Sequence, residues 1–418
     1  MAHLDLDEAE PACATDGVWL TCIECSATFA PFDDVRYTCD HCDGLLEVRY
    51  DTLPTWEDFE GEGVWRYSAA LPVDHGVSLP EGSTPLHDVP GLEASLGVER
   101  LRVKHEGMNP TGSFKDRGMT LGVAVADLVG VDRLACASTG NTSAALAAYG
   151  ARGGKETLVL LPAGKVAAGK VAQASLHGAR ILEVDGNFDT CLDIVQEMAA
   201  MGEVYLLNSL NPFRLEGQKT IGLEILEQFA DEEGSYPDRI VLPVGNAGNT
   251  AALYKCFREL VESGALPAEQ VPKLTGIQAA GAAPMVEAIE NDWDQTKRWE
   301  EVETRATAIR IGNPVNAAKA LPGIRETGGT ATAVSDEAIT EAQRALAEEG
   351  VGVEPASAAS IAGLRKLREQ GVVGAEEAVV CLTTGHLLKD PDAAAEAGVD
   401  PEPVPGTTDG VLDHLESN

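Results

Sequence analysis

Positive charge is scarce in this chain of 418 residues. Its 31 Lys and Arg, of which 12 are Lys, stand against 67 Asp and Glu, so the formal net charge is -36 and the pI is near 4.4. Nucleic acids and anionic membranes are bound by clusters of Lys and Arg, and the sequence has no such cluster. We therefore expect neither a nucleic acid nor a membrane as a partner.

An acidic, lysine-poor surface stays hydrated in concentrated salt and repels itself in dilute buffer. The acids are not confined to the acidic tails at residues 1–16 and 394–418, because further pairs stand at residues 348–349 and 376–377. The composition predicts adaptation to a high-salt cytoplasm. Charge carried by the tails alone is the competing explanation.

Long apolar runs and aromatic residues are also lacking. No run is long enough to cross a bilayer, and residues 1–5 lack the basic start of a secretory signal, so we expect a cytoplasmic protein. Aromatic residues make up only 5% of the chain, whereas glycine occurs 43 times. This balance favours an α/β protein of two or three domains over an all-β sandwich.

Four of the nine cysteines form two Cys-x-x-Cys pairs, Cys22 with Cys25 and Cys39 with Cys42. Each pair brings two thiolates together at a tight turn, and two pairs complete a tetrahedral metal site. The spacing predicts a structural zinc ribbon over residues 17–50, although four thiolates also bind iron. A nucleic-acid-binding ribbon is disfavoured, because this stretch holds six acids and two Arg.

From about residue 95 to residue 390, short β-branched runs alternate with longer Ala-rich stretches. This alternation is typical of parallel sheets covered by helices. It predicts two doubly wound α/β halves, residues 51–225 and 226–393, with a site in the loops that follow the strands. Strands are expected at residues 133–137, 156–161, 180–184, 239–244 and 378–382, and helices at residues 118–128, 142–150, 188–201, 215–229, 250–260 and 336–349.

A turn-rich segment at residues 109–118, Asn-Pro-Thr-Gly-Ser-Phe-Lys-Asp-Arg-Gly, places Lys115 at the start of a predicted helix. The helix dipole opposes a cation there, so the pKa of Lys115 should fall. A lowered pKa is what an amine needs to form a Schiff base and then to act as a base. An ordinary surface lysine is the alternative interpretation.

Three further loops follow predicted strands. Residues 138–143, Ser-Thr-Gly-Asn-Thr-Ser, can hold an anion, and residues 382–386, Leu-Thr-Thr-Gly-His, place a hydroxyl within reach of a ring nitrogen; helix-capping hydroxyls are the alternative for both. The third loop opens a helix with backbone amides that can cradle a phosphate, although it is neither a G-x-G-x-x-G motif nor a P-loop, and a tight turn without a ligand is its alternative. Its residues are Gly245, Asn246, Ala247, Gly248 and Asn249.

Together these segments resemble the pyridoxal-phosphate enzymes of the tryptophan-synthase-β type, which have fold type II, and more narrowly the threonine synthase family. The Ser-Phe-Lys core at residues 113–115 is shared with dehydratases and cysteine synthases, whereas residues 208–220 and 310–314 are more specific to threonine synthases. The resemblance covers nearly the whole chain from the cysteine pairs onward. One departure is Leu387, which stands where the family has a second glycine after Thr-Gly-His; we expect its side chain to point into the core.

The resemblance implies conversion of O-phospho-L-homoserine and water to L-threonine and phosphate, by γ-elimination and β-addition, in a homodimer. A dehydratase, a synthase acting on another phosphorylated amino acid, and a ribbon protein that has lost catalysis are the alternatives. The implied roles in cofactor binding are a covalent link to pyridoxal phosphate for Lys115, the ring hydroxyl for Asn141, the cofactor phosphate for residues 245–249 and the pyridine nitrogen for Thr384. The implied roles in substrate binding are the substrate phosphate for Asn208, Ser209 and Arg214 and the substrate carboxylate for Thr142.

Overall fold

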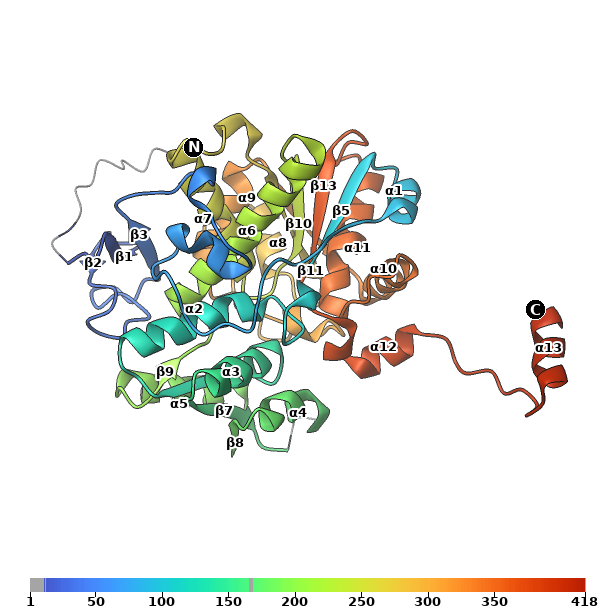
Figure 1. Cartoon of the computed structure of the whole chain (residues 1–418), viewed down its shortest axis with the longest axis horizontal. Helices are drawn as coiled ribbons and strands as arrows, with labels where there is room; N and C mark the ends of the chain where they lie inside the picture. The colour runs from blue at the N-terminus through green and yellow to red at the C-terminus, as the bar shows by residue number, and fades with distance from the viewer. Residues whose placement is uncertain (1–10, 12, 165–167, 418) are drawn as a thin grey trace.

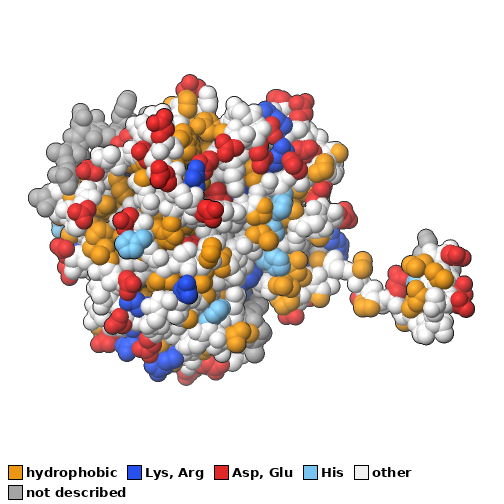
Figure 2. Space-filling model, viewed as in Figure 1, with side chains coloured by type: hydrophobic (Ala, Val, Ile, Leu, Met, Phe, Trp, Pro, Cys, Tyr) orange, Lys and Arg blue, Asp and Glu red, His pale blue; other side chains and the backbone are white. Residues whose placement is uncertain are grey.

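The computed structural model describes residues 11, 13–164 and 168–417. A small N-terminal sheet precedes two larger sheets that helices cover, and the last helix lies on an extended arm (Figure 1). Asp and Glu side chains are spread over the face drawn in Figure 2, as the net charge leads one to expect. No helix within the described ranges is long and apolar enough to cross a membrane.

The N-terminal sheet is antiparallel, with the order β2-β1-β3. Leu20 and Val48 of this sheet belong to the same hydrophobic cluster as Leu134 and Val159 of the next sheet. The sheet is therefore packed on the body of the protein through a shared core. Its strands are β1 (Val18–Cys22), β2 (Thr28–Phe29) and β3 (Leu46–Tyr50).

The second sheet is parallel, with the order β8-β7-β6-β9. Helices cover both of its faces, which explains why its central strands are almost wholly apolar. Its strands are β6 (Arg133–Ala137), β7 (Glu156–Pro162), β8 (Arg180–Val184) and β9 (Tyr205–Leu206). On one face lie α2 (Lys115–Leu128), α3 (Asn141–Arg152) and α4 (Ala168–Leu176), and on the other α5 (Phe188–Ala200).

The third sheet has the order β12-β11-β10-β13-β5-β4, and only β4 runs antiparallel to its neighbour. Its strands are β4 (Leu86–Asp88), β5 (Arg100–His105), β10 (Arg239–Pro243), β11 (Lys273–Ala279), β12 (Thr330–Val334) and β13 (Ala378–Thr383). One face is covered by α1 (Pro90–Leu96), α10 (Asp336–Glu348) and α11 (Pro355–Glu369). The other is covered by α6 (Pro212–Glu233) and α7 (Gly248–Glu262), with α8 (Pro284–Glu290) and α9 (Ala317–Glu326) beside them.

Short helical turns and two C-terminal helices complete the chain. The turns are η1 (Trp56–Asp58), η2 (Val64–Ala70), η3 (Glu106–Met108), η4 (Ala268–Gln270), η5 (Thr307–Ile309) and η6 (Leu387–Lys389). The C-terminal helices are α12 (Pro391–Ala397) and α13 (Thr408–Ser417).

The expected strands and helices are confirmed, with ends that shift by at most four residues. The strands β4 and β5, however, belong to the sheet of the C-terminal half, because β5 pairs with β13 along its whole length. The proposed boundary between residues 225 and 226 therefore does not coincide with the separation of the two sheets.

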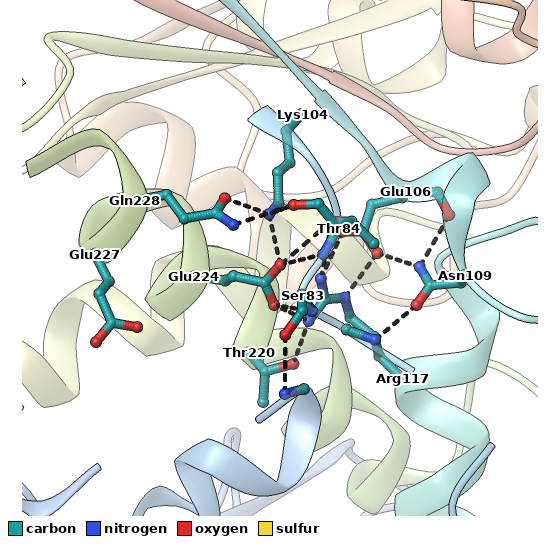
Figure 3. A network of polar contacts seen from close by, with 12 residues as sticks. Ser83, Thr84, Lys104, Glu106, Asn109, Arg117, Thr220, Glu224, Glu227 and Gln228 are labelled. Carbon is teal, nitrogen blue, oxygen red and sulfur yellow. Dashed lines mark hydrogen bonds and ion pairs between the residues drawn. The ribbon is translucent and has the colours of Figure 1, made fainter. Parts of the chain in front are cut away.

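A buried ion network holds β5, α2 and α6 together (Figure 3). Arg117 on α2 donates to both oxygens of Glu106 at 2.7 Å and to Glu224 on α6 at 2.8 Å. Glu224 also accepts from Lys104 on β5 at 2.6 Å. Two cations thus balance two carboxylates away from water, and Thr84, Thr220 and Gln228 supply further hydrogen bonds.

Replacing Arg117 by Met is expected to lower the free energy of unfolding by about 3–5 kcal/mol, because Glu106 and Glu224 would stay buried without their cation. Denaturant titration of the cofactor-free protein measures this loss. Arg133→Met is the matched control, since Arg133 forms a surface ion pair with Glu156 at 2.7 Å and its loss should not move the unfolding midpoint. Equal losses in both variants would contradict the importance of the buried network.

Candidate active site

The loops after β5 and β13 adjoin one another at the carboxyl ends of these parallel strands. Phe114 N–H donates to the Thr384 carbonyl oxygen at 3.0 Å, and His386 N–H donates to Gly112 at 2.9 Å. The two backbone segments therefore continue side by side beyond the sheet. This pairing brings Thr384 next to the loop that leads into Lys115.

Lys115 is the first residue of α2, as expected, and its side chain is half-buried. Its Nζ atom lies 4.2 Å from the centroid of the Phe114 ring. Burial, followed by the positive charge of Arg214, lowers the pKa of Lys115 to about 7, against the opposing effect of Glu354. The direction agrees with the sequence expectation, but the causes are burial and a neighbouring cation. An amine with this pKa can accept and return protons near neutral pH.

Arg214 is the third residue of α6 and is only 1% exposed. Its Nε, Nη1 and Nη2 atoms have no hydrogen-bond partner among the described residues. Burial lowers the pKa of Arg214 to about 10. A buried charge without a partner costs several kcal/mol, so this guanidinium, which lies close enough to Lys115 to affect its pKa, is suited to an anionic ligand.

Asn208, another expected phosphate ligand, lies two residues beyond β9, and most of the hydrogen-bonding capacity of its side chain is taken up by backbone groups. Its side chain accepts a hydrogen bond from Ala137 N–H at 3.0 Å and donates one to the Ala137 carbonyl at 3.0 Å. One amide hydrogen is left for a ligand. The neighbouring Ser209 is fixed through its carbonyl, which accepts from Asn316 at 3.1 Å.

Asn141 and Thr142 are the first two residues of α3, and Asn141 is held by a carboxylate that sequence reasoning left without a role. Its Nδ2 atom donates to both oxygens of Glu354 at 3.1 Å. Glu354 is buried, its backbone N–H bonds Gly385 at 3.0 Å, and burial raises its pKa. The sequence signal was a Glu directly before a Pro at the start of an Ala-rich helix.

Thr384 carries a buried hydroxyl that lies 3.0 Å from the hydroxyl of Ser357. Ser357 Oγ also accepts from the N–H groups of Thr384 and Gly385, both at 2.8 Å. Thr384 can accept from Ser357 and turn its own hydrogen towards a ligand. The side chain of Leu387 lies against Gly352, so its difference from the family pattern is accommodated by that contact.

The loop between β10 and α7 combines strain with partnerless polar groups. Ala247 has a φ of 61°, a left-handed conformation that costs roughly 1–2 kcal/mol in a residue with a side chain. Gly245 has little room for a side chain, since an added Cβ would be 3.0 Å from the Ala308 oxygen. Asn249 Oδ1 and Thr250 Oγ1 are buried without a hydrogen-bond partner in the described parts of the chain. Such a helix start suits a phosphate.

The four paired cysteines also come together. Their sulfur atoms lie within 4.8 Å of one another, with Cys22 and Cys42 at 3.5 Å and Cys25 and Cys39 at 3.5 Å. Tetrahedral zinc with Zn–S bonds of about 2.3 Å requires S···S distances of about 3.8 Å. The arrangement is therefore compatible with a four-thiolate metal site.

Residues 77–385 match the family model described as "Pyridoxal-phosphate dependent enzyme". The chain is 55% identical to threonine synthase from Methanosarcina acetivorans, over 95% of this chain and 98% of that protein. It is 54% identical to threonine synthase from Methanocaldococcus jannaschii, over 91% of this chain and 95% of that protein. The chain belongs to the threonine synthase family of pyridoxal-phosphate-dependent enzymes.

The fold of this threonine synthase family member is also similar to that of the processed form of threonine deaminase isoform 2 from Solanum lycopersicum. The TM-score is 0.63 at 21% identity, covering 83% of this chain and 98% of that chain. The expected fold type II architecture with parallel sheets is confirmed. The amine of Lys115, the partnerless groups at the start of α7 and the hydroxyl of Thr384 fit the family's cofactor.

In the cofactor-free protein, Lys115 is expected to react with a small acylating reagent with a pH midpoint near 7, since only the neutral amine is nucleophilic. Arg214→Met should raise this midpoint, because it removes a positive charge that lowers the pKa of Lys115. Peptide-level mass spectrometry of samples acylated across a pH series measures both. Arg133→Met should leave the midpoint in place, and a wild-type midpoint near 10.5 would contradict the geometry.

Proposed function

We propose that this protein converts O-phospho-L-homoserine and water to L-threonine and phosphate, the last step of threonine synthesis. The observation that carries the proposal is the buried Arg214, which lacks a hydrogen-bond partner in the described ranges and lowers the pKa of Lys115. A substrate with a terminal phosphate supplies the dianion that such a guanidinium favours. The identity to threonine synthases over almost their whole length supports the same reaction.

We assign pyridoxal phosphate to the loops described above. Lys115 would hold it covalently, Asn141 would contact its ring hydroxyl, residues 245–249 would bind its phosphate and Thr384 would meet its pyridine nitrogen. When bound, the cofactor would withdraw electrons from the substrate, so that a proton on the amino-bearing carbon and then one on the neighbouring carbon become removable. A neutral threonine at the ring nitrogen does not protonate it as an acid would, so more of the proton transfer depends on Lys115.

The residues of the chain divide the remaining work. Lys115 takes protons from Cα and Cβ of the substrate, and it delivers one to Cγ, which becomes the methyl group of threonine, and one back to Cα, as a pKa near 7 allows. Arg214, with Ser209 and the remaining amide hydrogen of Asn208, holds the phosphate group before and after it leaves Cγ. Thr142 at the start of α3 binds the carboxylate. Phosphate retained at Arg214 is placed to help activate the water that adds at Cβ.

The alternative is a dehydratase or a related synthase acting on another phosphorylated amino acid. A dehydratase needs no site for a distal phosphate. In such an enzyme no ligand would offset the cost of burying a guanidinium that the described residues leave without a partner. Arg214 therefore favours a phosphorylated substrate over an unphosphorylated one.

An assay with O-phospho-L-homoserine is expected to yield phosphate and L-threonine in equal amounts, and Lys115→Ala is expected to abolish turnover while leaving the fold intact. Phosphate, threonine and 2-oxobutyrate are quantified together on the pyridoxal-phosphate-loaded protein. Release of 2-oxobutyrate in place of threonine would support the dehydratase alternative. Full activity of Lys115→Ala would overturn the role of Lys115.

We also propose that Cys22, Cys25, Cys39 and Cys42 hold one structural zinc ion in a ribbon. The sulfur distances and the spacing of the two pairs support this proposal. Metal analysis of protein purified without added metal should give about one zinc per chain. Cys22→Ser should lower both the metal content and the unfolding midpoint, because Cys22 is buried. Finding iron would show that the site exists but that the metal is not zinc. Finding no metal would refute the site.

We infer in addition that the enzyme is a cytoplasmic homodimer adapted to concentrated salt. The net charge of -36 supports the adaptation to salt, because mutual repulsion of the acids is screened by salt. The unfolding midpoint is expected to rise with potassium chloride up to molar concentrations. Sedimentation is expected to give the mass of a dimer. A midpoint that does not depend on salt would contradict the adaptation.

A further inference from the structure

Several of the few lysines are buried where strand β3 meets the body of the protein. Lys319 on α9 donates from Nζ to the Leu46 carbonyl at 2.5 Å, and Lys255 on α7 donates to the Val48 carbonyl at 2.5 Å. The chain has few lysines, and burying a cation carries a desolvation cost. The backbone of β3, the strand that follows the second cysteine pair, is thus clamped by side chains of two helices.

Glu216 on α6 is the centre of this cluster and is 1% exposed. It accepts from Lys219 at 2.8 Å, from Lys255, and from the Tyr50 hydroxyl at 2.7 Å. The ring of Tyr50, the last residue of β3, lies 4.7 Å from Lys219 Nζ and 5.2 Å from Lys255 Nζ. The end of β3 is therefore bonded directly to the second turn of α6.

The first turn of α6 carries Arg214, two residues before Glu216. Arg214 has no hydrogen-bond partner in the described parts of the chain, and a cation at a helix N-terminus is opposed by the helix dipole and by burial. A movement of the turn that brought Arg214 into water would therefore lower its free energy. Residues two apart on a helix do not face each other, so Glu216 cannot neutralise Arg214 directly. It can only hold the turn in place.

Movement of this turn would also affect Lys115. A Cβ added to Gly217 would lie 1.9 Å from the Arg117 carbonyl oxygen, and one added to Gly118 would lie 3.0 Å from that of Arg214. The helices α6 and α2 are thus in close backbone contact at Arg214 and at Gly217. A shift of α6 must therefore change the position of Arg214 relative to the amine of Lys115.

A second connection runs through α9. Asn316 directly precedes this helix, and its side chain donates to the Ser209 carbonyl at 3.1 Å. Its backbone N–H donates to the Asn246 carbonyl at 3.0 Å. Lys319, one turn further along, makes the bond to β3. The same strand is therefore bonded to the helix that supports the substrate-phosphate segment and the cofactor-phosphate loop.

We propose that Tyr50 and Glu216 are positioning residues for the anion site, through which strand β3 and the thiolate cluster before it set the position of Arg214. The inference rests on the proposed function in assigning Arg214 to a phosphate group. It gives the N-terminal cysteine module a role in phosphate affinity, whereas a merely stabilising module would affect unfolding alone.

Tyr50→Phe removes one hydroxyl and keeps the ring beside the two lysines. Isothermal titration of the pyridoxal-phosphate-loaded protein with inorganic phosphate is expected to show a rise in Kd of about threefold or more. The KM for O-phospho-L-homoserine should rise in parallel with little change in kcat. Loading with the cofactor matters, because its own phosphate then occupies the α7 loop.

Tyr67→Phe is the matched control. Tyr67 is buried and donates from its hydroxyl to Glu227 at 2.7 Å, on the same helix α6 but thirteen residues beyond Arg214. Its loss removes the same kind of bond from the same helix, and phosphate affinity should stay at the wild-type value. If the two variants weaken phosphate binding equally, or if Tyr50→Phe binds like wild type, the inference is overturned.

Cys42→Ser tests the connection to the thiolate cluster. It should weaken phosphate binding as Tyr50→Phe does, and the double variant should be no weaker than the worse single one, because both act through β3. Additive losses would show independent effects and contradict the inference. Failure of the wild type to bind phosphate would instead overturn the proposed function and this inference with it.

Discussion

The close packing of α2 against α6 is the contact on which the candidate site depends. Gly217 can approach the Arg117 carbonyl only because it has no side chain, and the first turns of these helices carry Lys115 and Arg214. The buried ion pair of Arg117 with Glu224 also joins these two helices, and Glu106 forms a second ion pair with Arg117. The fold thus places two cationic side chains together in a buried region.

The two side chains, Lys115 and Arg214, differ in how burial affects their charge. The lysine responds by losing basicity, whereas a guanidinium stays protonated even with a lowered pKa. The chain therefore keeps one permanent buried charge that its described residues do not neutralise. Structural ion pairs elsewhere, such as that of Lys104 with Glu224, are complete within the protein. This contrast separates a site built for a ligand from clusters built for the fold.

Local signals made much of this site predictable from the sequence. A strand followed by small polar residues places its loop at a sheet edge, and this pattern located residues 245–249 and Thr384 in the fold. Lys115 was located by a turn-rich segment that precedes a helix. The pairing of β5 with β13 was not predictable in this way, because the two strands are more than 270 residues apart. The residues of β5, Arg-Leu-Arg-Val-Lys-His, alternate as in a half-exposed strand, whereas Lys104 is a buried cation that only its distant partners explain.

Other features lay beyond residue-type reasoning. Asn208 is a plausible phosphate ligand by chemistry, yet its amide is mainly bonded to the Ala137 backbone. Glu354 became visible as a site residue only when the fold placed it beside Asn141. Neither outcome follows from spacing, because both depend on contacts between segments that are far apart in the sequence.

The distribution of charge also has a kinetic consequence. Arg214 lies in the interior, while Asp and Glu are spread over the drawn surface of a chain with net charge -36 (Figure 2). A phosphorylated, negatively charged substrate must therefore diffuse through a repulsive field before it meets the cation that binds it. The range of that field falls from about 10 Å at 0.1 M salt to about 3 Å at 1 M. Encounter with such a substrate should therefore become faster as salt rises, the reverse of enzymes that attract their substrates electrostatically.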